Sequence, residues 1–396
     1  MTICGRCSHL GGFPLCPQED AMPPPSPASL WDYFAELPDA RRSQGRRHKL
    51  RDILTIALCA VLCGADDLTE IEAFGETKEA WLRQFLDLPH GIPSHDTFGR
   101  VFAALDPQAF GRCFMSWVRE VAELSEGAVV AIGGKTLRRS YDAAAECPAI
   151  SLVSAWARDN RLTLGQVKVA EGSNEITAVP ELLRALALEG CVVTADALNC
   201  QKQTAAEISR RGADYVLALK GNHGALRERV EQFFSAVREG RTHGFQIGEQ
   251  RSVEKGHGRI EARHFWQASA PDDLRAGGEW ADLRSVGLCE AEREVGGRVA
   301  THRRYYLSSL PVEVTKFAEA ARGHWAVENS CHWVLDVVFG EDASRARSGH
   351  AAENLALLRR LVNNLLQHER SVKRGVKAKR LKAALDEQYL LKVLRL

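Results

Sequence analysis

The chain has 396 residues, a formal net charge of +1, a hydrophobic fraction of 45% and a charged fraction of 26%. This composition excludes wholesale disorder, and the longest uncharged apolar stretch, residues 53–65, is too short to span a bilayer. The length predicts two or three domains, and the absence of an opening secretion-signal pattern predicts a cytoplasmic protein with reduced cysteines.

Residues 1–30 differ in composition from the rest of the chain. Their proline-rich stretch opposes both helix and strand: Pro23, Pro24, Pro25 and Pro27. They also hold four side chains of the kinds that bind zinc: Cys4, Cys7, His9 and Cys16. A single Cys-x2-Cys pair is a weak signal, so we expect a disordered extension, or translation starting at Met22, in preference to a zinc site.

Basic side chains are concentrated in two places. Residues 41–51 hold six lysines and arginines and no acid, including the candidate DNA contacts Arg41, Arg42, Arg46 and Arg47. Residues 359–382 hold nine basic residues and one acid, and 371–396 is expected to form a basic C-terminal helix or tail. For either cluster alone, a solvated linker or helix face is the favoured interpretation. Two clusters around one core favour a polyanion such as nucleic acid.

Residues 31–125 are predicted to form a small helical domain. Apolar residues recur at helical spacing near 53–64, 69–74, 78–86, 96–105 and 107–118. Short helices beside a basic segment fit a helix-turn-helix-like DNA reader, but they fit a packing domain without groove contacts equally well.

From residue 126 the pattern changes to strands that alternate with helices. Strands are expected at 128–132, 150–156, 162–169, 191–195 and 215–219, with helices at 179–188 and 202–210. This order is that of an α/β ribonuclease-H-like core, in which three antiparallel strands are joined by two parallel ones. A strand-rich insertion at about 222–315, with strands at 254–265 and 303–307, precedes a final helical segment that ends near residue 370.

Such a core performs phosphoryl transfer with two divalent ions, and Mg²⁺ or Mn²⁺ prefers carboxylate ligands. The carboxylates must come from the first strand, the fourth strand and a C-terminal helix. Asp196 closes the fourth strand, and Glu328 and Asp336 lie eight residues apart in the helix predicted near 322–336. An ordinary strand-end aspartate is the alternative interpretation of Asp196.

The motifs resemble those of bacterial insertion-sequence transposases of the DDE type, in the group that includes the H-repeat-associated proteins. The matching stretches follow the same order as in that group: 131–140, 193–201, 215–221, 257–263, 306–310 and 322–337. The resemblance implies that Asp196 and Glu328 are the second and third metal-binding carboxylates, with Mg²⁺ or Mn²⁺ as cofactor. It also implies double-stranded DNA partners (terminal inverted repeats and target DNA), self-association on DNA and a place at the nucleoid.

Gly133 departs from this family pattern. The family has an aspartate, its first metal ligand, where this chain has Gly133 within Ala-Ile-Gly-Gly-Lys. Asp142 is too far along the chain to replace it. We therefore expect a transposase with impaired catalysis. The alternative is a non-catalytic DNA-binding relative that occupies element ends and regulates transposition.

Other residues are candidates for nucleic-acid contact. Near the first strand and in the insertion they are Lys135, Arg138, His257, Arg259 and Arg263. Trp325 and Trp333 fit either base stacking or core packing. His332 is a candidate for orienting Glu328.

Overall fold

The computed structural model describes residues 30–42, 46–141, 148–242, 244–256, 259–295 and 298–394. The zinc-type residues near the N-terminus, the expected disorder there, Asp142 and His257 lie outside these ranges. Within them, no helix combines the length and apolar character needed to cross a membrane.

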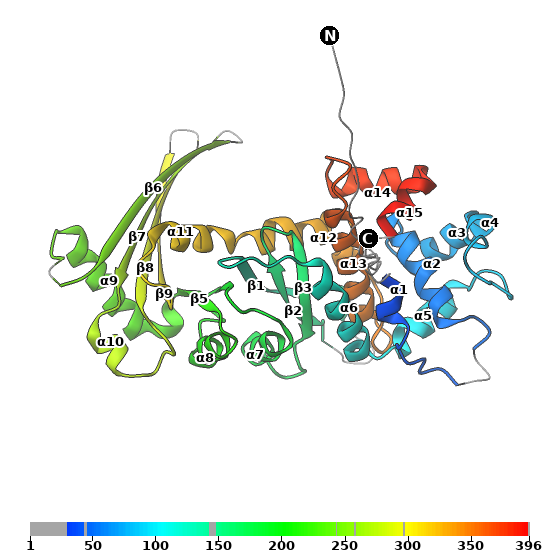
Figure 1. The fold of residues 1–396 in the computed structure, drawn as a ribbon, viewed down its shortest axis with the longest axis horizontal. Coiled ribbons are helices and arrows are strands. Elements are labelled where there is room, and N and C mark those ends of the chain that lie inside the picture. The colour runs from blue at the N-terminus through cyan, green and yellow to red at the C-terminus, as the bar shows by residue number, and fades with distance from the viewer. Residues whose placement is uncertain are drawn as a thin grey trace, which may run out of the picture.

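A mixed sheet runs through the molecule (Figure 1), and its nine described strands have the order β3-β2-β1-β4-β5-β9-β8-β7-β6. The first five are β1 (Val129–Thr136), β2 (Ser151–Ala157), β3 (Leu162–Lys168), β4 (Val192–Ala195) and β5 (Asp214–Leu219). β2 pairs antiparallel with both β1 and β3. On the other side of β1, β4 pairs with it in parallel, and β5 pairs in parallel with β4. The expected fold class, an α/β core with ribonuclease-H-like strand order, is confirmed.

The insertion strands extend the same sheet rather than forming a separate one. They are β6 (Ile247–Gly256), β7 (Arg259–Ser269), β8 (Ser285–Val295) and β9 (Arg298–Ser308), and β9 pairs antiparallel with β5. The single strand expected at 254–265 is wrong, because β6 ends at Gly256 and β7 begins at Arg259. Gly256 and Gly258 stand at this point of the sequence as a turn signal, which the prediction overlooked.

Helices cover both faces of the core sheet (Figure 1). On one face, α11 (Val314–Gly323), a π-helical turn η3 (Val327–His332) and α12 (Trp333–Val337) follow one another. On the other face lie α7 (Glu175–Ala185) and α8 (Lys202–Arg210). α7 begins four residues before the expected Val179, because the Asn174 side chain accepts a hydrogen bond from the Ile176 N–H and caps the helix there.

The N-terminal helices gather around the long C-terminal helix α13 (Ala351–His368) (Figure 1). The N-terminal helices are α1 (Leu30–Phe34), α2 (Leu50–Leu62), α3 (Leu68–Thr77), α4 (Glu79–Leu82), α5 (His95–Ala104) and α6 (Pro107–Val121). The remaining helices are α9 (Gly224–Arg238), α10 (Asp272–Ala276), α14 (Val376–Leu385), α15 (Glu387–Leu394) and the short turns η2 (Gly221–His223) and η4 (Glu341–Ala343). One apolar core runs from α2 and α5 through α13 into the sheet.

The basic cluster at 359–382 does not form one exposed surface. Arg359, Arg360, Lys379 and Arg380 are buried. Arg360 donates to Glu341 at 2.8 Å, with both side chains fully buried, and Arg380 donates to the Val61 carbonyl. These four side chains therefore point into the protein and do not face a polyanion.

Candidate active site

The register of two neighbouring strands places Gly133 beside Asp196. β1 and β4 run parallel, and Ile132 pairs with Ala195. Gly133 and Asp196 are the next residues along these strands, so they lie next to each other where β4 ends. The carboxyl ends of parallel strands are where α/β proteins commonly place their binding sites.

Asp196 and Glu328 line one pocket of about 150 Å³. Asp196 follows β4, and Glu328 projects from the π-helical turn η3. Lys220, directly after β5, and His324 and Trp325, between α11 and η3, also line this pocket. Such wide helical turns are rare and are frequent at functional sites. The structure thus brings two sequence-predicted carboxylates together.

Asp196 is held by its neighbour Asn199. The Asp196 Oδ1 atom accepts hydrogen bonds from the Asn199 backbone N–H at 3.1 Å and from its Nδ2 at 3.0 Å. Nδ2 also donates to Glu175 Oε2 at 3.2 Å. Burial raises the pKa of the Glu175 carboxyl, the Asn199 hydrogen bond lowers it, and the charge of Asp196 raises it further. Asn199 therefore couples the orientation of Asp196 to a second, half-buried carboxyl.

Gly133 faces the η3 turn. A Cβ atom built on Gly133 would lie 2.9 Å from Val327 Cγ1 and 3.3 Å from His332 Cε1. Burial, and then the nearby Arg360 and Lys135, lower the pKa of His332 to about 3, so its ring is neutral. Its buried Nε2 has no hydrogen-bond partner among the described residues. A polar ring with an unused nitrogen thus lies beside the position where the sequence resemblance predicts an aspartate.

The side chains present do not fit a pair of metal ions. Within the described ranges, no group of three or more His, Cys, Asp or Glu side chains is placed to hold a metal. Asp336 does not join Asp196, because its Oδ1 accepts from Lys135 Nζ at 2.6 Å. Two carboxylates remain where two-ion phosphoryl transfer uses three or more oxygen ligands.

The basic residues predicted near β1 differ in exposure. The Lys135 side chain is only 7% exposed and pairs with Asp336 and Asp342, so its ammonium group is out of reach of a surface phosphate. Arg138 is 81% exposed and lies 3.3 Å from Asp342. Arg138 is therefore the more accessible of the two.

The basic segment before α2 is partly internally paired. Arg41 donates to Asp39, and Arg46 donates to the Arg41 and Asp39 carbonyls. Arg42 and Arg47 are exposed. Of the four arginines, Arg42 and Arg47 are therefore the most accessible to a phosphate.

In the insertion, Arg263 on β7 pairs with Glu254 at 2.7 Å and Glu261 at 2.8 Å. Arg259 begins β7, where it pairs in register with Gly256 and Val295. The side chain of Arg263 remains 20% exposed and lines a second cavity of about 400 Å³.

Sequence reasoning missed Lys220, Arg304 and His324, which line the carboxylate pocket. The His324 Nδ1 atom lies 3.3 Å from Thr194 Oγ1, and burial lowers the pKa of the ring although Asp196 opposes this. Lys220 directly follows β5, which runs parallel to β4, the strand before Asp196. Its place after that strand was the signal available in the sequence. Arg304 lines the pocket from β9 in the insertion. No local sequence pattern predicts this contact.

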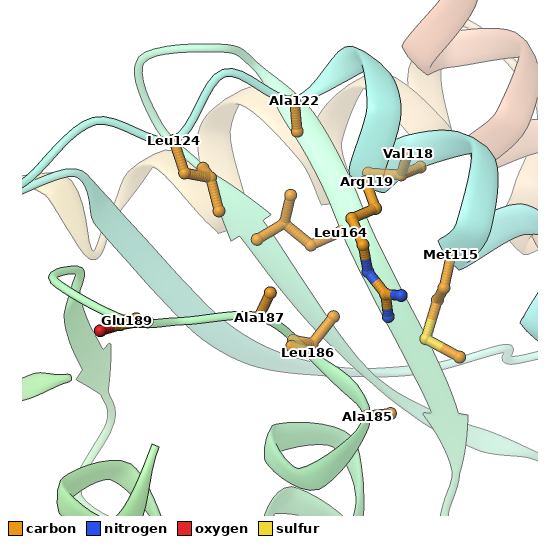
Figure 2. A pocket seen from close by; sticks show the side chains of 10 residues that line it. All are labelled: Met115, Val118, Arg119, Ala122, Leu124, Leu164, Ala185, Leu186, Ala187 and Glu189. Atoms are coloured by element: carbon orange, nitrogen blue, oxygen red, sulfur yellow. The ribbon is translucent and has the colours of Figure 1, made fainter. Parts of the chain in front are cut away.

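A separate cavity of about 220 Å³ lies between α6, β3 and the chain after α7 (Figure 2). Its lining is mostly aliphatic, with Arg119 and Glu189 as its only charged side chains. Neither Asp196 nor Glu328 reaches it, so it is not part of the carboxylate site.

Most of the chain matches models of known protein families. A family model described as "Transposase DDE domain" matches residues 103–365, and one described as "DDE_Tnp_1-associated" matches 31–118. The chain is 41% identical to the "Putative transposase YncI" of Escherichia coli O157:H7, over 92% of this chain and 94% of that one. It is 39% identical to the "H repeat-associated putative transposase YhhI" of Escherichia coli K12, over 92% and 97%. A solved piggyBac transposase complex with hairpin DNA covers 93% of this chain and 77% of its own, at 10% identity and a TM-score of 0.43.

Proposed function

Because the chain belongs to the family with the DDE transposase domain, we propose that it binds the ends of an insertion sequence but cuts and joins DNA poorly. The single observation behind this proposal is the composition of the site. Asp196 and Glu328 share a pocket, while the adjacent strand position holds Gly133.

Loss of one carboxylate affects the whole reaction rather than one contact. Two-ion phosphoryl transfer uses one ion to activate the attacking oxygen and another to stabilise the leaving oxygen, and shared carboxylates fix both. Asp196 and Glu328 offer ligands for one loosely held Mg²⁺ or Mn²⁺ ion. We therefore expect DNA binding without efficient strand cleavage.

The partner we propose is double-stranded DNA, both the terminal inverted repeats of the element and the target. Exposed arginines, Arg42, Arg47 and Arg138, are available for its phosphates. Joining two element ends requires at least two copies, so we expect self-association on DNA at the nucleoid. A stable tetramer in DNA-free sedimentation would contradict assembly that depends on DNA.

A second candidate function is favoured by Gly133 itself. A chain that binds element ends and does not cut them would compete with an active copy and reduce its transposition. Co-expression with an active relative distinguishes the two candidates, because an inert competitor lowers the excision frequency whereas an active enzyme raises it.

The direct experiment uses labelled duplexes that carry the element's ends, incubated with the chain in Mg²⁺ or Mn²⁺. The expected result is a shifted complex with little or no nicked product. Efficient cleavage by the chain as written, surviving Asp196→Ala, would mean that the assigned carboxylates are wrong.

A further inference from the structure

The two edges of the nine-stranded sheet differ in how their backbone groups are satisfied. At the β3 edge, the Asn364 side chain on α13 accepts a hydrogen bond from the Thr163 N–H and donates one to the Thr163 carbonyl, each at 2.8 Å. At the β6 edge, no described residue forms a backbone hydrogen bond with the outer side of the strand. An unpaired edge of this kind is a template for pairing with another strand.

The hydrogen bonds between β6 and β7 show which residues of β6 face outward. The Ser269 N–H donates to the carbonyl of Gln246, directly opposite it, and the register then continues through β6 without a shift. In antiparallel strands, pairs that exchange backbone hydrogen bonds alternate with pairs that do not. The even-numbered residues of β6 therefore bond to β7, and the odd-numbered residues from 247 to 255 direct their N–H and C=O groups outward.

A second copy of β6 can pair antiparallel with the first only where these outward groups meet. Directly opposed residues share a face of the sheet, so odd-numbered residues must oppose odd-numbered ones. Two such registers align most of the strand. One aligns 247–255 around a two-fold axis at Arg251 and sets the two arginines against each other. The other aligns 248–256 around an axis at Ser252 and avoids this repulsion.

The register centred on Ser252 matches the exposed side chains of the two copies. Glu249 of each copy lies opposite Lys255 of the other, and both side chains are exposed in the single chain. Val253, which is 64% exposed, lies opposite Arg251, whose aliphatic stem can cover it. Opposite charges in directly opposed positions stabilise strand pairing, whereas like charges destabilise it. The strand is therefore complementary to itself.

Ser252 carries a hydroxyl without a partner. Its Oγ atom is buried and has no hydrogen bond to any described residue. On the two-fold axis, the two Ser252 residues would form an opposed pair without backbone hydrogen bonds between them, with Cα atoms about 4.5 Å apart. Each hydroxyl would then meet its counterpart, and cross-strand hydroxyl pairs of this kind stabilise sheets.

We propose that β6 is a self-association surface that pairs antiparallel with β6 of a second copy around Ser252, so that the two sheets become one. The inference rests on the self-association proposed above and names its surface and register. The far ends of β6 and β7 extend beyond α9 and α11 (Figure 1), which leaves this edge accessible. One pair of short strands is marginally stable in water, so pairing is weak in the DNA-free chain and increases when DNA holds two copies together.

The experiment forms a disulfide across the proposed axis. Ser252→Cys is expected to link two copies under mild oxidation, because the opposed Cα atoms are within the separation that a disulfide bridges. Val253→Cys is the matched control: the side chain is exposed, but its two copies would lie diagonally, about 7–8 Å apart, and should link far more slowly. Mass spectrometry of the linked peptides distinguishes this disulfide from links through the native cysteines.

A charge exchange tests the register. In the Ser252→Cys protein, Lys255→Glu sets like charges against each other in both symmetric pairs and should slow linking by about 10-fold. Adding Glu249→Lys restores opposite charges and should recover most of the rate. Glu294→Lys is the control, because Glu294 is exposed on β8, two strands from this edge, and its reversal should leave the rate unchanged.

Linking is measured in the DNA-free chain at high concentration and on element-end duplexes. Absence of linking at Ser252→Cys in both conditions, or equally fast linking at Val253→Cys, would overturn the inference. Complexes that hold two element ends while Ser252→Cys stays unlinked would also overturn it and leave the proposed function intact. Linking in a chain that binds no DNA would instead support the inference and reject the proposed function. Thermal unfolding of each variant shows whether a slower rate reflects a loss of fold.

Discussion

Val327 packs into the space that a side chain on Gly133 would need. A Cβ atom on Gly133 would approach Val327 Cγ1 to 2.9 Å and Cγ2 to 3.1 Å, closer than ordinary van der Waals contact. Gly133 lies in β1 and Val327 is the first residue of the η3 turn, so the two residues meet where the turn packs on the strand. Apolar contact therefore fills the place where the sequence resemblance predicts a carboxylate, and any side chain introduced at 133 must move Val327.

Gly133→Ala is expected to destabilise the protein, by about 1–3 kcal/mol, as is typical of overpacking. Val327→Ala alone should also destabilise it by leaving a small void. The double variant should lose less than the two single variants together, because each change relieves the other. Denaturant unfolding of the four proteins measures this coupling, and strictly additive losses would show that the two residues do not press on each other.

The exposed arginines before α2 should set part of the salt dependence of DNA binding. Replacing both Arg42 and Arg47 with Ala should weaken duplex binding and flatten the slope of log affinity against log salt by about 2, since each phosphate contact contributes about 0.9. The control replaces Arg241 and Arg275, exposed arginines paired with Glu239 and Asp272. If both double variants give the same slope as the unsubstituted chain, residues 41–51 are only a solvated linker.

The ion pair between Arg360 and Glu341 is fully buried, at 2.8 Å. Glu341→Ala should cost about 3–5 kcal/mol of unfolding free energy, because it leaves an uncompensated charge in the core. Replacing both residues, as Arg360→Met with Glu341→Leu, should recover most of this loss. Chemical denaturation measures both effects. A Glu341→Ala variant as stable as the unsubstituted chain would contradict the buried pairing.

His332 should make folding stability depend on pH. Its pKa in the folded state is about 3, below the usual value of about 6.5. The unfolded chain therefore binds a proton that the folded chain does not, so stability is complete above pH 6.5 and falls as the pH drops toward 3. One such group contributes up to about 1.4 kcal/mol per pH unit.

The corresponding variant is His332→Gln, followed by denaturant unfolding between pH 7.5 and 4.5. It should show a shallower loss of stability than the unsubstituted chain. Some slope should remain, because burial also lowers the pKa of His324. Identical slopes in the two proteins would mean that His332 is solvated and titrates normally.

Local pattern was enough to predict the core sheet. The continuous apolar runs before Gly133 and Asp196 predicted two buried strands, and their parallel pairing follows from the crossover through α7. The α8 helix at Lys202–Arg210 was predicted with its observed limits. The hairpin between β6 and β7 was missed although Gly256 and Gly258 offered a turn signal in the sequence.

Local sequence patterns could not predict the contacts between segments that are distant in the chain. Lys135, three residues before Arg138, was a candidate for nucleic-acid contact, yet it is buried and pairs with Asp336 and Asp342, about two hundred residues away. Arg360 and Arg380 likewise find their partners in other elements. The resemblance to transposases indicated Asp196 and Glu328, but Val327 against Gly133 emerged only from packing.

The central claim is that Gly133 is what impairs this site, and it is tested by metal-dependent cleavage of the element's own ends. The proteins to compare are the unsubstituted chain, Gly133→Asp and Gly133→Asp with Val327→Ala, the last of which makes room for the new side chain. Gly133→Asn is the matched control, because it has nearly the same shape without the charge.

We expect no cleavage by the unsubstituted chain or by Gly133→Asn. Gly133→Asp should recover cleavage, most strongly with Val327→Ala, and a further Asp196→Ala or Glu328→Ala should abolish it. The measurement is the rate of nicked product in Mg²⁺ and in Mn²⁺. Folded, DNA-bound Gly133→Asp proteins that leave the ends uncut, or an unsubstituted chain that cuts them as fast, would contradict the account.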